Sequence, residues 1–175
     1  MVLTRGRTAR TAAAAVVAAT ALALTGCGGD DSFELRDWHA PGQNASVGDV
    51  LVRYAHVAEP KGEPWQIGDD IPAYVWLLND GDKTDRLVGA SSSNAESVDI
   101  VDADGKRLPD GVELPPNQLQ QLERGKSHLL LRDVRQVVRG GDFMKITLNF
   151  EKAGSVTFNI QSQVPAYDTS PTPSG

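Results

Sequence analysis

A series of short apolar segments, each closed by turn-forming residues, constrains the fold of this 175-residue chain more than any other feature of its sequence. Asp49–Ala58 and Ser155–Val164 alternate between apolar and polar residues, as strands with one buried face do. Ile71–Leu78 is apolar almost throughout, which indicates a central strand. The other strand patterns are Arg86–Ala90, Ser97–Asp102, Gly111–Leu114, Gln118–Leu122, His128–Val134 and Phe143–Glu151.

These patterns favour an all-β domain. No long stretch repeats its apolar residues every 3.6 positions, although Val134–Arg139 could hold one helical turn. Asp102-Ala103-Asp104-Gly105 has the composition of a tight hairpin turn and lacks the later ligands of a calcium loop. The sequence therefore predicts an antiparallel β-sandwich of about eight or nine strands over residues 49–164.

The stretch Lys126–Gly154 holds two of these strands, joined by a basic connection that contains glycine. Because the two strands follow each other closely, we expect them to form a hairpin in the middle of the β core. The first of them begins at His128, the histidine whose neighbours most suggest chemistry.

The first 26 residues have the pattern of an export signal. Three arginines, Arg5, Arg7 and Arg10, precede an apolar run from Ala12 to Leu24. That run of 13 residues is too short for a stable membrane span, which needs roughly 20 residues, and fits a signal peptide, whose apolar region takes about 7–15. We expect this segment to be removed from the mature protein.

The signal ends in Leu24-Thr25-Gly26-Cys27, which matches the lipobox of bacterial lipoproteins. In that pathway the cysteine sulfur receives a diacylglyceryl group and the chain is cleaved just before it. Because Cys27 is the chain's one cysteine, its acylation leaves no thiol for a disulfide. The sequence predicts a protein anchored at Cys27 to the extracytoplasmic face of the cell membrane. The alternative is an ordinary secretory signal with a spare cysteine.

The mature chain is acidic and is expected to carry mobile ends. Loss of the three signal arginines leaves 14 basic and 23 acidic residues, a formal net charge of −9, which argues against nucleic acid as a partner. Residues 27–48 are rich in Gly, Asp, Ser and Asn and are predicted to form a flexible tether. Residues 165–175, rich in Pro, Ser and Thr, are predicted to be a disordered tail.

Several segments of the sequence resemble those of periplasmic copper chaperones of the PCu(A)C family. Ala73–Asn79 (AYVWLLN) and Asp85–Ser92 (DRLVGASS) are similar to the family's core motif. Ser127–Leu131 is similar to its H-x-M strand, and Leu148–Gly154 (LNFEKAG) to its penultimate strand and turn. The resemblance implies a cupredoxin-like or immunoglobulin-like β-sandwich, and copper as the candidate cofactor.

The copper ligands are where this chain departs from the family. The family's ligands are a histidine, a methionine in the following hairpin and a later His-x-Met pair, a set whose soft donors favour Cu(I). Here Val101 stands at the position of the first histidine, and the hairpin after it has no methionine. His128 keeps its place, but Leu130 replaces the methionine of the pair. His128 therefore remains a metal-ligand candidate with little support, and its alternative role is structural.

Two further features could contact a partner. Trp65 lies in a loop rich in Pro and Gly and could be an exposed aromatic contact or could fold back onto the core. Arg132, Arg135 and Arg139, with Lys145, could form a basic patch for an acidic partner or lipid headgroups, or a solvated connection.

We therefore expect a lipid-anchored, non-enzymatic binding or assembly module with most of its copper ligands missing, acting on a protein of the cell envelope. The alternative is a working copper chaperone that uses His128 and non-standard ligands to supply an envelope or respiratory enzyme.

Overall fold

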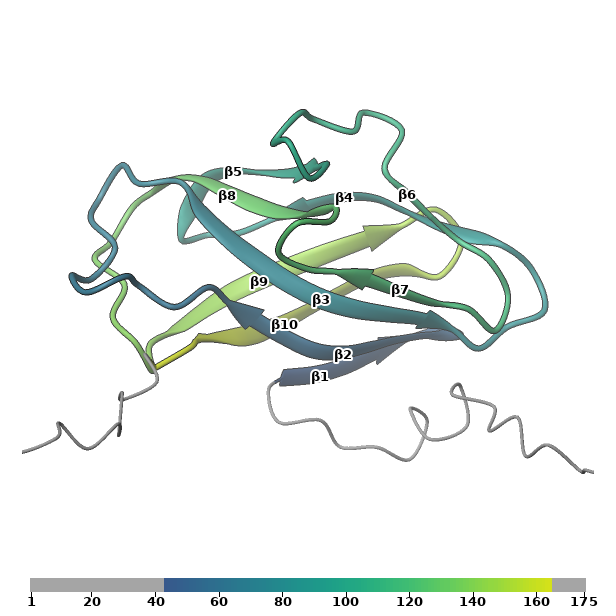
Figure 1. The fold of residues 1–175 in the computed structure, drawn as a ribbon. Helices are drawn as coiled ribbons and strands as arrows, with labels where there is room; N and C mark the ends of the chain where they lie inside the picture. Colours follow the sequence, from purple (N-terminus) through teal and green to yellow (C-terminus); the bar gives the residue numbers. More distant parts are fainter. Residues whose placement is uncertain (1–42, 165–175) are drawn as a thin grey trace, which may run out of the picture.

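The computed structural model describes residues 43–164, which form ten β-strands (Figure 1). The strands are β1 (Gln43–Val47), β2 (Val50–Val57), β3 (Ile71–Asn79), β4 (Asp85–Ser91), β5 (Ala95–Val101), β6 (Val112–Leu114), β7 (Leu119–Leu122), β8 (His128–Val134), β9 (Phe143–Phe150) and β10 (Gly154–Ser162). The all-β prediction is confirmed. The predicted signal, the lipobox with Cys27, most of the tether and the tail lie outside the described residues.

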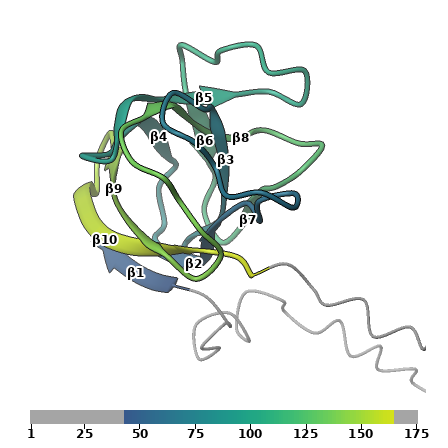
Figure 2. The ribbon, with the colours of Figure 1, turned by 90° about the vertical axis from the view of Figure 1, so that its left-hand side faces the viewer.

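The strands form two layers that are joined at both edges. One layer has the order β1-β2-β3-β8-β5, and the other has the order β10-β9-β4-β6. In the first layer, β7 and β8 pair with different parts of the same edge of β3. Short pairings close the edges: β2 lies parallel to β10 over two residue pairs, and β4 meets β5 at Ala90 and Val98. The view along the strands in Figure 2 shows this closed cross-section.

The hydrophobic core fills the space between the layers. In β3, the predicted central strand, Val75 and Leu77 are buried, while Tyr74 and Trp76, which alternate with them, lie half-buried on the outer face. β8 follows the same alternation, with Leu129 and Leu131 buried. β3 pairs with β2 on one edge and with β7 and β8 on the other, so its predicted central position is confirmed.

The structure corrects one predicted boundary and one predicted helical turn. Gln43–Val47 is strand β1, paired with β2, so the folded domain begins within the predicted tether 27–48 and not at residue 49. Val134–Arg139 holds no helical turn: after β8 ends, the chain bends and Val138 forms a β-bridge with Trp65.

The predicted hairpin of β8 and β9 does not form. β8 pairs with β5 and β3, and β9 pairs with β10 and β4, so the two strands lie in different layers. The connection 135–142 therefore crosses from one layer to the other.

Asp85, at the start of β4, binds the turn between β9 and β10. Its buried carboxylate accepts hydrogen bonds from the backbone N–H groups of Arg86 (2.7 Å), Lys152 (2.9 Å) and Ala153 (2.9 Å). Burial would raise the pKa of Asp85, but these donors outweigh it and hold the pKa below its usual value. Two stretches that carry the family resemblance, Asp85–Ser92 and Leu148–Gly154, thus meet at this carboxylate.

Asn79, the last residue of β3, has a similar role at the same end of the domain. Its side-chain Nδ2 donates to the carbonyl oxygens of Lys83 and Leu114, each at 2.8 Å, and its Oδ1 accepts from the N–H of Gly81 at 3.1 Å. The amide thereby fixes the turn between β3 and β4 and the end of β6.

In residues 43–164, no helix is long and apolar enough to cross a bilayer.

Candidate functional site

A row of side chains crosses the outer face of the larger layer at the level of His128. Val101 on β5 pairs with His128 on β8, and Tyr74 on β3 pairs with His56 on β2. Tyr74 lies between the two histidines, with its ring centroid 6.0 Å from that of His128 and 5.4 Å from that of His56. The fold therefore brings Val101 beside His128, and it also brings His56 close to the same site.

The half-buried His128 is held through the backbone. Its Nδ1 lies 2.9 Å from the carbonyl oxygen of Lys126, which can only accept, so Nδ1–H donates and Nε2 is left for another partner. Leu130 lies two residues farther along the same face, paired with Asp99 on one side and Pro72 on the other. His128 and Leu130 thus share one face, as the H-x-M pattern requires.

Val101 is fully buried, although it lies at the end of its strand. The hairpin that follows folds back over it: Val101 forms a β-bridge with Arg107, and the N–H of Leu108 donates to the carbonyl of Ile100 at 2.8 Å. The Asp102 carboxylate accepts from the N–H groups of Asp104 (3.0 Å) and Lys106 (2.9 Å). This confirms the predicted tight turn, in which backbone N–H groups of the turn already bind the Asp102 carboxylate.

The side chains around His128 offer a metal ion one imidazole, that of His128 itself. In residues 43–164, no three side chains of His, Cys, Asp or Glu are grouped so that they could hold a metal. Asp99, the acidic neighbour of Leu130, is bound by Arg132 at 3.1 Å and by Arg107 at 3.3 Å. Met144 is fully buried in the core between the layers and does not add a thioether to this face. The donor set does not fit a Cu(I) site of the family's kind.

Trp65 lies against the core. It is half-buried, packs against the core cluster, and donates its indole N–H to the carbonyl of Ala58 at 3.2 Å. Of the two alternatives for this residue, the one in which the loop folds back is the one observed.

The three arginines of the predicted basic patch are not equivalent. Arg132 pairs with Asp70 at 2.6 Å as well as with Asp99, and the hydrogen bonds with both carboxylates raise the pKa of its guanidinium. Arg135 pairs with Glu96 at 2.6 Å. Arg139 is exposed. Acidic partners therefore offset much of this patch's positive charge.

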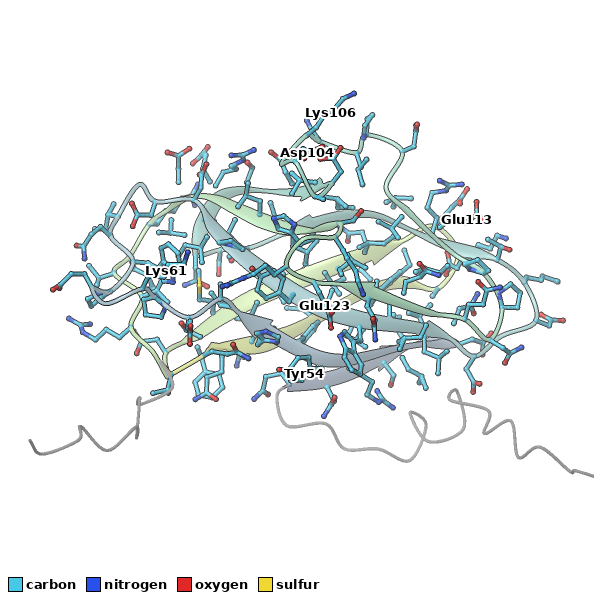
Figure 3. All side chains as sticks on the ribbon, viewed as in Figure 1. Tyr54, Lys61, Asp104, Lys106, Glu113 and Glu123 are labelled. Carbon is cyan, nitrogen blue, oxygen red and sulfur yellow. The ribbon has the colours of Figure 1, made fainter. Side chains whose placement is uncertain are left out.

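A hollow of about 370 Å³ opens beside His56, on the same outer face. Its lining consists of Tyr54, His56, Ala58, Glu59, Tyr74, Glu123, Arg124 and Gln163. Figure 3 labels Tyr54 and Glu123, which reach it from β2 and from the turn after β7. The sequence signal that points to it is the aromatic residues at alternate positions of β2 and β3, although the register irregularity that turns Tyr54 and His56 outward is not visible in the sequence.

His56 forms the inner wall of this hollow. Only 7% of its surface is exposed, and its Nδ1 lies 2.9 Å from the carbonyl oxygen of Tyr54. Burial lowers the pKa of the imidazole, against the opposing effects of that carbonyl and of the Glu123 charge. Burial of the ring therefore favours its neutral form.

Comparison with known proteins places this geometry in a family. The LpqE-like family model matches residues 50–162, from the start of β2 to the end of β10. The chain belongs to the LpqE-like family. No curated protein matches this LpqE-like chain.

Solved PCuAC domains have the same fold as the LpqE-like domain. The copper-bound PCuAC domain from PmoF2 is 30% identical, with a TM-score of 0.60 over 70% of this chain and 99% of that domain. The apo PCuAC domain from PmoF1 is also 30% identical, with a TM-score of 0.61 over 70% and 100%. Cu(I)-DR1885 from Deinococcus radiodurans, 23% identical with a TM-score of 0.54 over 71% and 83%, shares the fold. The resemblance to PCu(A)C proteins is confirmed.

Proposed function

We propose that this protein is a lipid-anchored, extracytoplasmic and non-catalytic binding or assembly module that has the PCuAC fold without the family's copper site. The observation that carries the proposal is the pairing of His128 with the buried Val101, with Leu130 beside it on the same face. A histidine and a methionine at these two places would complete a soft-donor set, whereas valine and leucine offer no lone pair.

The surroundings of the two described histidines support a non-catalytic role. His56 and His128 each direct Nδ1 to a backbone carbonyl, of Tyr54 and Lys126 respectively. Neither ring is therefore oriented by a carboxylate at that nitrogen, as the histidine of a serine-type triad is.

A copper titration tests the proposal. We expect the mature chain to bind neither Cu(I) nor Cu(II) with sub-micromolar affinity, because a single imidazole cannot replace the hydration shell of the ion. The titration should be made on the Cys27→Ala protein against a competing chromophoric chelator, since an unacylated thiol would itself bind Cu(I). Sub-micromolar binding that His128→Ala abolishes would contradict the proposal.

That contrary result would favour the second candidate function, a copper chaperone that uses His128 with non-standard ligands to supply an envelope or respiratory enzyme. Its supporting observations are the Nε2 atom of His128, which the Lys126 bond leaves available, and the similarity to a copper-bound PCuAC domain.

The lipid anchor has its own test. Replacing Cys27 with Ala removes the atom that would carry the diacylglyceryl group, so we expect the protein to move from the membrane fraction to the soluble fraction or the medium. The control is Thr25→Ala, which keeps the cysteine. Membrane retention of Cys27→Ala would contradict acylation at this residue.

A further inference from the structure

Most of the large exposed apolar side chains of residues 43–164 lie at one end of the domain. Ile67, Phe143 and Val164 are 68%, 52% and 56% exposed, and the fourth such side chain, Val88, lies elsewhere, on β4. The end consists of the loop 58–70, the connection 135–142 and the last residues of β10, together on the left of Figure 1, and is called the apolar end below. None of its three exposed side chains belongs to the core cluster of the described residues, so core packing does not account for them.

Backbone contacts hold the parts of the apolar end together. Trp65 in the loop forms a β-bridge with Val138 in the connection. The N–H of Gly141, also in the connection, donates to the carbonyl of Ser162 at the end of β10 at 2.8 Å. The three exposed side chains therefore belong to one structural unit.

Ile67 lies at the tip of a turn whose geometry is fixed by hydrogen bonds. The N–H of Asp69 donates to the carbonyl of Gln66 at 3.1 Å, and the Asp69 carboxylate accepts from the N–H of Gln66 at 2.7 Å. Gly68, with a φ of 92°, supplies the positive φ that the third position of a type II turn requires. Such tips favour Gly, Pro, Asn, Asp and Ser. Neither turn formation nor core packing therefore accounts for an isoleucine at this place.

A second turn of the same construction precedes Phe143. The N–H of Asp142 donates to the carbonyl of Arg139 at 3.1 Å, the Asp142 carboxylate accepts from the N–H of Arg139 at 2.8 Å, and Gly141 has a φ of 93°. Phe143 is the first residue of β9, directly after this turn. Val164 lies beside the turn, because a Cβ atom at Gly141 would be 4.0 Å from its side chain. Two fixed turns thus hold the three apolar side chains in water.

The chain that leads to the predicted lipid anchor joins the domain beside the apolar end. Gln43, the first described residue, pairs with Ala55, close to the point where β2 ends and the loop 58–70 begins. Residues 28–42, which separate Cys27 from Gln43, can span at most roughly 50 Å. A connection of this length keeps the domain at an effective concentration in the millimolar range near the bilayer. Even weak contact with the bilayer would therefore keep the apolar end against it.

Charge does not add to such a contact. The loop 58–70 and the connection 135–142 together hold three basic and five acidic residues. Lys61, which Figure 3 labels at this end, and Arg139 are exposed, but Glu63 is exposed beside them. The apolar end therefore has no net attraction for anionic headgroups, and burial of apolar side chains is the attraction that it can offer.

We propose that the apolar end docks on the lipid bilayer that carries the anchor, with Ile67, Phe143 and Val164 inserted at the boundary between headgroups and acyl chains. The partner is the bilayer itself, contacted through apolar burial and not through headgroup charge. The opposite end, at which β3 finishes with Asn79, then faces away from the membrane. This inference rests on the proposed function, since anchoring at Cys27 supplies the bilayer.

The test uses the mature chain, coupled through the thiol of its one cysteine, Cys27, to a maleimide lipid in phosphatidylcholine vesicles. Ile67→Trp, Phe143→Trp and, as the matched control, Val88→Trp each add one reporter to the tryptophans of the parent protein. Bromine atoms on the acyl chains quench a tryptophan that reaches them. After subtraction of the parent signal, we expect loss of the added emission in Ile67→Trp and Phe143→Trp, and none in Val88→Trp.

Removing the apolar side chains should release the domain from the bilayer. In a Val164→Trp protein, Ile67→Ser with Phe143→Ser should lower the ratio of docked to free domains by about tenfold or more, because each change removes a large apolar side chain from the contact. Val88→Ser in the same protein should leave the quenching unchanged. All of these positions are exposed, so the substitutions leave the core intact.

Three outcomes would overturn the inference: no quenching in Ile67→Trp and Phe143→Trp, equal quenching in Val88→Trp, or quenching that needs anionic lipid and is lost in added salt. The last would indicate headgroup contact through Lys61 and Arg139. Failure here is separable from failure of the proposed function, because the maleimide lipid replaces the natural anchor. Release of Cys27→Ala from cell membranes, without quenching in the vesicles, would remove this inference alone.

Discussion

Asp85→Ala is expected to lower the free energy of unfolding by about 3 kcal/mol, because it leaves three backbone N–H groups without their buried acceptor. The groups belong to Arg86, Lys152 and Ala153, so the change acts on both β4 and the turn between β9 and β10. Urea denaturation followed by tryptophan fluorescence measures it. The matched control is Asp82→Ala, an exposed aspartate of the preceding turn, which should change stability by less than about 0.5 kcal/mol.

The same carboxylate gives a pH dependence of defined sign. Its pKa is lower in the folded protein than in the unfolded chain, so the unfolded chain binds more protons between the two values and stability falls as the pH falls. The Asp85 contribution is present above about pH 3.8 and is lost below it. Stability of the wild type should therefore decrease more steeply in this range than that of Asp85→Ala. Equal slopes would contradict this assignment.

Placing the family's ligand types at Val101 and Leu130 should have the largest effect on copper binding. We expect Val101→His with Leu130→Met to raise Cu(I) affinity on the order of 100-fold or more over the parent protein, since the ion gains an imidazole and a thioether beside His128. Residues paired directly across two antiparallel strands have Cβ atoms roughly 5 Å apart and share a face. Val101 and His128 are such a pair, so both imidazoles can reach one ion.

The measurement is a chelator competition on the Cys27→Ala background. Adding His128→Ala to the double variant should abolish the gain, and Leu130→Met alone should produce a small one. Because Val101 is fully buried under its hairpin, the larger imidazole is expected to cost about 1–3 kcal/mol of stability, which a thermal melt checks. A folded double variant with unchanged affinity would show that the copper site of the family requires more than these two residues.

The strands were largely predictable from sequence, because alternation records which residues face the core. The patterns at Asp49–Ala58 and Ile71–Leu78 correspond to β2 and β3 within a residue or two. β1 was missed, since its sequence QNASV has too few apolar residues to differ from a tether. It is a strand because the edge of β2 supplies backbone partners, which a local pattern does not record.

Pairing and site geometry were harder to predict for the same reason. The alternation of β8 and β9 is equally consistent with a hairpin and with strands in opposite layers. The positive φ of Tyr54 depends on its register with β3, and no local residue preference indicates it. The expectation that Val101 and Leu130 stand at two ligand positions came from the residue types and the family resemblance, and the fold places both residues beside His128.

The parallel contact of β2 with β10 has a consequence for how the domain is made. β2 begins at Val50, and its partners Gln161 and Ser162 are among the last residues of the described domain. Closure of this edge must wait until nearly the whole chain has left the ribosome or the export channel. Closing so long a loop is entropically slow, and sheets dominated by distant pairings fold in milliseconds to seconds. Until then His56 and Val57, at the end of β2, lack their partners on the edge that β1 covers for the rest of the strand, so the domain stays open at this edge.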